Sequence, residues 1–301
     1  MHLDQLIIDL ATILSVAGIM TIIFQKIHQP VVLGYILAGF IVGPHTPPLK
    51  LVVDTPSIRT LAELGVIFLM FTLGLEFSFR KLLSVGVTAT VAAGLEVVFF
   101  LTVGYGLGQA LGWSAMDSIF LGAILSISST TIIIKALEEL KLKTHRFAHL
   151  IFGILVVEDL IAILLLVGLT TIATSQATLS AVSLLTAVLN LAMVVGGWFI
   201  TGYFLVPRLM TYLSRRASNE LVTVVALGLC LSLVVLASHL GYSPALGAFI
   251  MGSIIAETKM VHRIEGLMAP LKDVFGAIFF VSIGMLIDPQ VIWQFKGTIL
   301  L

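Results

Sequence analysis

Long apolar runs separated by short polar turns recur along the whole chain. Eleven segments can be read, at about residues 3–25, 31–43, 58–76, 83–111, 115–137, 148–172, 181–206, 219–239, 243–256, 269–287 and from 290 onward. A run of about 20 apolar residues can cross the hydrocarbon core as a helix, whereas barrel strands alternate with a period of two. The pattern predicts an all-α polytopic membrane protein with about eleven transmembrane helices, although hydropathy alone also allows ten or twelve.

The composition agrees with this prediction and excludes several function classes. The chain is 59% hydrophobic and 11% charged, while soluble domains carry about 25% charged residues. Its net charge is zero and its basic residues lie in short loops, so no nucleic acid is expected as a partner. No P-loop, nucleophile elbow or Cys/His ligand spacing occurs, so we expect no enzyme activity, no cofactor and no resident metal. We expect one membrane domain over residues 1–301, without a soluble regulatory domain.

The loop charges predict the orientation of the chain. With the N-terminus outside, thirteen of the sixteen Lys and Arg residues fall on the cytoplasmic side, and Lys50, Arg59 and Lys296 fall outside. Cytoplasmic loops carry an excess of Lys and Arg, so this orientation in a cell (inner or plasma) membrane is predicted.

Two pairs of segments resemble each other across the chain. LGYILAG at 33–39 matches LGAFIMG at 246–252, and GVIF at 65–68 matches GAIF at 276–279, with an offset of about 211–213 residues. Seven segments separate the copies, so the second copy crosses the membrane in the opposite sense. Inverted repeats are typical of secondary transporters. The alternative is chance, because small residues recur wherever membrane helices pack closely.

Two adjacent carboxylates interrupt the apolar run FGILVVEDLIAILLLV at 152–167. Placing Glu158 or Asp159 at mid-membrane costs roughly 2.5–3.5 kcal/mol each, so such acids indicate an ion or proton site. Consecutive helix positions point about 100° apart, so the two cannot face one partner in the same way. A carboxylate that binds either a proton or a cation is the simplest antiporter. The alternative is a buried acid pair that is neutralised by protonation or by a lysine and fixes helix packing.

A run of hydroxyl residues, SISSTT at 126–131, lies at mid-depth in the fifth segment. Hydroxyls such as those of Ser128, Ser129, Thr130 and Thr131 can satisfy backbone groups where a membrane helix breaks, and broken helices contribute to transporter ion sites. The alternative is a continuous helix whose hydroxyls bond back to carbonyls one turn earlier. Two weaker candidates are Glu96, which is functional, structural or lipid-facing, and Lys272, which either snorkels to the interface or pairs with the acids.

Together, PVVLGYILAGFIVGP at 30–44, GVIFLMFTLGLEF at 65–77, SSTT at 128–131, the run at 152–167 and FGAIFFVSIGMLIDP at 275–289 resemble the monovalent cation:proton antiporter family. The resemblance is to its second group, which includes Kef-type glutathione-gated potassium efflux systems. It implies thirteen helices in two inverted repeats, forming a core domain and a dimerisation domain, usually in a homodimer. It also implies that Asp159 carries cation and proton beside a crossing of two broken helices, one of them containing Ser128–Thr131.

The chain departs from the family pattern at three points. The residue before the aspartate is typically Gln in Kef-type systems, Asp in electrogenic sodium antiporters and Asn in electroneutral exchangers, whereas here it is Glu158, which leaves stoichiometry and the choice of K⁺ or Na⁺ open. No nucleotide-binding domain follows, so Kef-type gating is not carried over. The counterparts of the fifth and sixth segments would fall near residues 330 and 360, so we expect a C-terminally truncated chain that does not transport by itself.

The function expected is therefore exchange of K⁺ or Na⁺ for protons across the lipid bilayer by alternating access. Two alternatives remain open: a sodium-coupled organic anion symporter of the same architecture, and a channel-like or sensory membrane module. Proton-independent uptake would favour the symporter, and currents far above carrier turnover would favour the channel.

Overall fold

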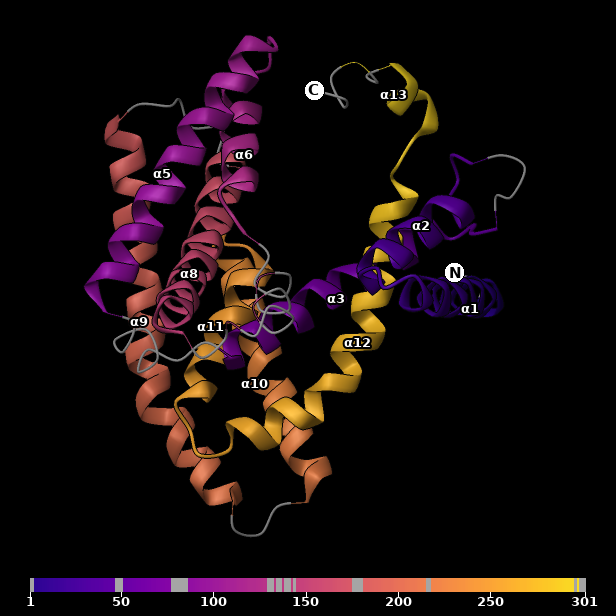
Figure 1. The fold of residues 1–301 in the computed structure, drawn as a ribbon. Coiled ribbons are helices and arrows are strands. Elements are labelled where there is room, and N and C mark those ends of the chain that lie inside the picture. Colours follow the sequence, from indigo (N-terminus) through magenta and orange to yellow (C-terminus); the bar gives the residue numbers. More distant parts are fainter. Residues whose placement is uncertain are drawn as a thin grey trace. The chain divides into compact units, whose positions relative to one another are not determined.

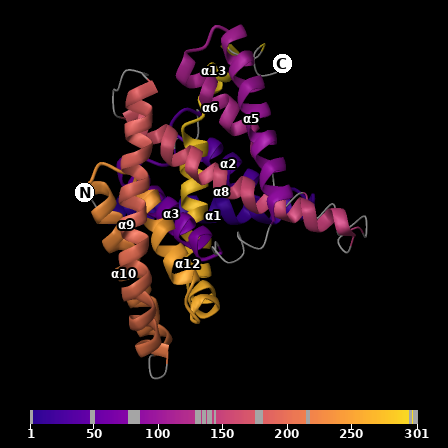
Figure 2. The same cartoon turned by 90° about the vertical axis from the view of Figure 1, so that its left-hand side faces the viewer.

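The computed structural model describes residues 3–46, 51–76, 86–128, 133, 137, 142, 145–174, 181–214, 218–294 and 297. All regular structure in these residues is helical (Figures 1 and 2). The helices are α1 (Leu3–Lys26), α2 (Val31–Val42), α3 (Thr55–Glu76), α5 (Val87–Ala110), α6 (Ala115–Leu125), α8 (Arg146–Thr174), α9 (Ala181–Ser214), α10 (Asn219–His239), α11 (Pro244–Ala256), α12 (Val261–Met285) and α13 (Pro289–Gln294). Each corresponds to one predicted segment, which confirms the all-α polytopic prediction.

Two helices are longer than their apolar segments. Helix α9 ends at Ser214 rather than 206, and α12 begins at Val261 rather than 269. Hydropathy marks only the apolar part of a helix, while the backbone hydrogen bonds are internal and can continue into the polar interface. Both helices also contain a proline, Pro207 and Pro270, which removes one backbone hydrogen bond without ending the helix.

Five of the described helices are long and apolar enough to cross a membrane: α1, α3, α5, α10 and α12. Helices α2, α6 and α11 are apolar but shorter. Both α2 and α11 follow the pattern expected for the repeat, since α2 is preceded by Pro30 and α11 begins at Pro244.

The chain divides into two compact units, which are described separately. Unit 1 comprises Met1–Glu76 and Gly202–Leu301, and unit 2 comprises Phe77–Thr201. Unit 1 therefore contains α1–α3, the end of α9, and α10–α13. Unit 2 contains α5, α6, α8 and the first part of α9.

In unit 1 the two repeat copies cross each other at glycines. A Cβ on Gly39 of α2 would lie 1.9 Å from the carbonyl oxygen of Val281 in α12, and a Cβ on Gly252 of α11 would lie 2.2 Å from that of Phe71 in α3. The repeat pairs Gly39 with Gly252, so the same contact occurs once from each copy. The sequence repeat therefore corresponds to a repeated packing arrangement.

The structure extends the repeat to the helix before each copy. In α1, Met20 presents its carbonyl oxygen 3.2 Å from where a Cβ on Gly34 would lie; in α10, Leu233 does the same for Gly247 at 2.6 Å. Both pairs are related by 213 residues (20 to 233, 34 to 247), the offset found in the sequence. Hence α1 and α10 are also counterparts.

Contacts between helix ends in unit 1 confirm the predicted alternation. The start of α1 and the residues before α3 meet where Asp9 Oδ2 accepts the Asp54 N–H at 2.7 Å. The starts of α10 and α12 meet where Arg263 donates two hydrogen bonds to Asn219 Oδ1, at 2.9 and 2.7 Å. Each contact joins ends that the topology assigns to one side. Which side is cytoplasmic stays a prediction.

In unit 2, α5 packs closely on α6 (Figure 1). A Cβ on Gly104 would lie 2.4 Å from the Cα of Gly122, and one on Gly108 would lie 2.5 Å from the hydroxyl of Ser118. Gln109 adds a hydrogen bond from Nε2 to the Ser118 hydroxyl at 2.8 Å. Because α5 also packs against α8, it links the two segments that contain the candidate ion-site residues.

Candidate ion site

The fifth predicted segment is interrupted at its hydroxyl run. Ser114 caps α6 at its N-terminus by accepting the Asp117 N–H, and the helix ends at Leu125. The backbone N–H of Ser126 still reaches carbonyls of the last turn, but Ile127 and Ser128 are not helical. The prediction of a broken helix is therefore confirmed at this point, and the continuous-helix alternative is wrong for residues 126–128. Ser129, Thr130 and Thr131 lie outside the described residues.

Glu158 is the buried acid of this site. It lies on α8, only 1% of its surface is exposed, and its Oε2 accepts a hydrogen bond from the hydroxyl of Ser128. A buried carboxyl group needs such partners, because an unpaired one loses its hydration without compensation. The hydroxyl run and the acid pair, which the sequence places in successive segments, therefore meet in space at Ser128 and Glu158.

Glu96 of α5 is brought to the same place. Its carboxyl group lies within hydrogen-bonding reach of the Glu158 carboxyl, and its side chain is only partly buried. Two carboxyl groups and one hydroxyl from three separate segments thus form a cluster, Ser128–Glu158–Glu96. The sequence named Glu96 as an accessory candidate but did not identify its partner, because the 62 residues between the two acids carry no periodic signal that could relate them.

Asp159 follows Glu158 on α8, and its side chain lies outside the described residues. Its position on the helix is about 100° around the axis from that of Glu158. The predicted role of Asp159 as the exchanging acid stays a prediction. Lys272 belongs to α12 in unit 1, where its ammonium nitrogen lies 3.9 Å from a carboxylate oxygen of Asp273. The predicted accessory role of Lys272 also stays a prediction.

A buried acid that the sequence did not single out lies in unit 1. Asp9 of α1 is fully buried, and its carboxylate accepts hydrogen bonds from Gln5 at 2.8 Å and from the N–H groups of Val53 and Asp54 at 3.1 and 2.7 Å. These bonds attach α1 to the residues that precede α3. The only local signal was an Asp within the apolar face of the first segment.

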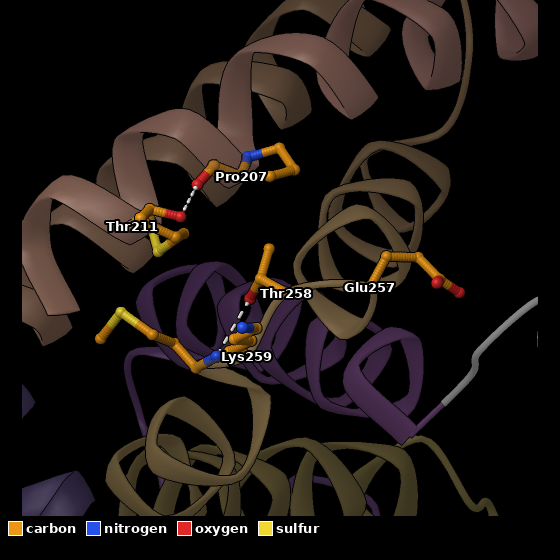
Figure 3. Close-up of a pocket in the computed structure, with 7 residues that line it drawn as sticks. Pro207, Thr211, Glu257, Thr258 and Lys259 are labelled. Atoms are coloured by element: carbon orange, nitrogen blue, oxygen red, sulfur yellow. Dashed lines mark hydrogen bonds between the residues drawn. The ribbon is translucent and has the colours of Figure 1, made fainter.

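Unit 1 also contains a small pocket of about 250 Å³ between α9 and the turn after α11. It is lined by Pro207, Met210, Thr211, Glu257, Thr258, Lys259 and Met260. Figure 3 shows that the hydroxyls of Thr211 and Thr258 are used in hydrogen bonds and that the Glu257 carboxylate points away from both. None of the ion-site candidates lines this pocket.

The comparisons with known proteins place the chain in a family. Residues 11–301 match the family model described as the transmembrane sodium/hydrogen exchanger, and the chain belongs to this family of transporters. A solved structure, the sodium proton antiporter MjNhaP1 from Methanocaldococcus jannaschii, aligns over 98% of this chain and 74% of its own with a TM-score of 0.72. At 17% identity, that likeness shows the shared fold.

Curated relatives carry the resemblance at the sequence level. The chain is 36% identical over 301 residues to the putative cation/proton antiporter YbaL of Escherichia coli, and 33% identical over 302 residues to K(+) efflux antiporter 5 of Arabidopsis thaliana. It spans 53% and 52% of their lengths, about half in each case. It is 30% identical to the K(+)/H(+) antiporter subunit KhtU of Bacillus subtilis, covering 99% of this chain and 76% of that relative. The expected family and its Kef-type group are confirmed.

Proposed function

We propose that this chain forms the membrane part of a secondary transporter that exchanges a monovalent cation for protons. The observation that carries the proposal is the buried carboxyl group of Glu158, bonded to Ser128 at the break after α6 and adjacent to Asp159 on α8. Membrane-buried acids beside broken helices are the arrangement that ion-coupled carriers use. The printed names of YbaL, KhtU and K(+) efflux antiporter 5 support K⁺ as the first cation to test and Na⁺ as the second.

In the proposed cycle Asp159 is the exchanging group and Glu158 its modulating neighbour. An ionised carboxylate binds a cation through its oxygens, and the same oxygens bind a proton when the cation has left. Alternating access then presents the loaded site to each side of the membrane in turn. The hydroxyl and carbonyl oxygens of 128–131 are the proposed further ligands of the cation.

The assembly and placement of the transporter are part of the proposal. The resemblance to cation:proton antiporters supports a homodimer in the cell membrane, and the loop charges support an outside N-terminus. Lys272 is proposed as an accessory basic group of the transport cycle. Full activity is proposed for the full-length protein that contains this chain, since the chain spans about half the length of YbaL and K(+) efflux antiporter 5.

The test uses that full-length protein in proteoliposomes with a preset pH gradient, to which K⁺, Na⁺ or Li⁺ is added. Wild type is expected to dissipate the gradient with at least one cation, and Asp159→Asn to abolish this response. The matched control is Glu63→Gln, which removes a carboxylate that is 71% exposed and is expected to respond as wild type does.

Three results would contradict the proposal. If Asp159→Asn dissipates the gradient as fast as wild type, Asp159 is a structural residue. Uptake of an organic anion that depends on Na⁺ and not on protons would indicate a symporter instead. Single-channel currents far above carrier turnover would indicate a channel-like module.

A further inference from the structure

Glu158 is held from two sides by groups on other segments. Ser128, in the non-helical residues after α6, donates to its Oε2, and Glu96 of α5 lies in hydrogen-bonding contact with the same carboxyl group. With 1% of its surface exposed, Glu158 is shielded from water. Its carboxyl group is therefore bonded within the protein rather than open to an ion path.

The contact between Glu96 and Glu158 requires a proton. An ionised carboxylate has only acceptors, so two carboxyl groups share a hydrogen bond only when one of them is protonated. If the shared proton left, two negative charges would face each other next to a buried site, and like charges at that distance strongly disfavour double ionisation. One proton therefore stays with the pair while the cluster is intact.

We propose that Glu96 is a positioning residue of the ion site: together with Ser128 it keeps Glu158 engaged, so that Asp159 alone exchanges and one proton moves per monovalent cation. This inference rests on the proposed antiport function and adds its coupling ratio. Each half-cycle balances: one proton leaves the Asp159 carboxyl as one cation binds, and the reverse occurs on the other side. No net charge crosses the membrane.

The sequence alone left this ratio open, because a second acid beside the exchanging aspartate could carry a second proton. The contacts of Glu158 decide between the two possibilities. A second carrier must alternately bind and release its proton, but the Glu158 carboxyl is already bonded to Ser128 and Glu96. Removing Glu96 should free Glu158 and allow it to act as that second carrier.

The experiment measures the coupling ratio of the full-length protein in proteoliposomes. Proton flux driven by a K⁺ gradient is recorded with a pH dye, and charge movement is recorded on a solid-supported membrane. Wild type is expected to give one proton per K⁺ and no net charge movement. Glu96→Leu is expected to raise the ratio towards two and to produce charge movement, whereas Glu96→Gln, whose amide can still donate to Glu158, is expected to keep it at one.

The outcomes separate this inference from the function beneath it. A wild-type ratio of two overturns the inference even if no Glu96 variant folds, because Glu158 would then be a carrier. A folded Glu96→Leu that keeps a ratio of one also overturns it and leaves the antiport function standing. Wild type without any cation-driven proton flux overturns the proposed function, and the inference with it.

Discussion

Gly74 of α3 and Gly252 of α11 face each other so closely that neither position accommodates a side chain. A Cβ on Gly252 would lie 2.9 Å from the Cα of Gly74, and one on Gly74 would lie 3.0 Å from the Cα of Gly252. Gly39 and Gly284 repeat this relationship between α2 and α12, at 2.9 and 3.0 Å. Since the repeat exchanges Gly39 with Gly252 and Gly74 with Gly284, the two crossings are related by the pseudo-two-fold symmetry of the repeat.

Gly252→Ala is therefore expected to destabilise the protein, because the new methyl group collides with backbone that cannot rotate away. Overpacking of this kind costs about 1–3 kcal/mol. The measurement is thermal unfolding of purified protein in detergent. Gly228→Ala in α10 is the matched control, since nothing lies within 4 Å of a Cβ there. Equal melting temperatures for the two variants would contradict the close crossing.

Asp9→Ala is expected to loosen the residues before α3. It leaves the N–H groups of Val53 and Asp54 without their acceptor, at a cost of about 1–3 kcal/mol for a buried donor left unpaired. Hydrogen exchange at residues 51–54 should speed up, and the melting temperature should fall. Asp4→Ala, at an exposed position of the same helix, is expected to change neither. Unchanged exchange in Asp9→Ala would show that other contacts hold this segment.

Asp54 should make a pH-dependent contribution to stability. The hydroxyl and then the backbone N–H of Ser57 bond to its carboxylate and hold the pKa of Asp54 below its ordinary value. A carboxyl whose pKa is lower in the folded than in the unfolded state stabilises above the unfolded pKa, about 3.9, and loses this contribution as the pH falls through the folded pKa.

Asp54→Ala is accordingly expected to lower the melting temperature at pH 7, and the charge-dependent part of this difference should disappear below about pH 4. Asp54→Asn serves as the control, because its amide oxygen can accept from Ser57 at every pH. Melting curves between pH 3 and pH 8 test this. A difference between Asp54→Ala and wild type that stays constant over the range would contradict it.

Cys230 offers a test of orientation. It is the single cysteine of the chain and is fully buried, so a membrane-impermeant maleimide is expected to leave wild type unlabelled. With the N-terminus outside, Val53→Cys should be labelled on intact cells, and Lys259→Cys only after the cytoplasmic face is opened. Val53 is 68% exposed and Lys259 is also exposed, so access to either is controlled by the membrane. The reverse labelling pattern would invert the predicted topology.

The helices were predictable because the bilayer imposes a length and an apolar composition on each of them. The two ends that were misplaced, in α9 and α12, lie where the helix leaves the apolar layer and hydropathy no longer reports it. The repeat was legible for the same kind of reason: crossings such as Gly39 with Gly284 admit no side chain, so glycine appears at matching positions in both copies.

The candidate site was predictable only in part. A carboxylate inside an apolar helix is conspicuous in a sequence, and so is the hydroxyl run that interrupts the fifth segment, which led to Glu158 and Ser128. The contact between Glu96 and Glu158 was not, and neither was the burial of Asp9 under the residues before α3. Those acids are conspicuous singly, but nothing local in the chain states which groups they meet.

The sequence by itself therefore determined the class of protein, the number and order of its segments, the inverted repeat and the acids that belong to the membrane. These properties follow from the cost of placing each residue type in hydrocarbon, which depends on local composition. The tertiary structure alone decided that Glu158 is bonded to Ser128 and Glu96, and that the repeat copies cross at Gly39–Gly284 and Gly74–Gly252. Such contacts depend on how helices distant in the chain pack, and close packing is set by shape in three dimensions rather than by any pattern along one segment.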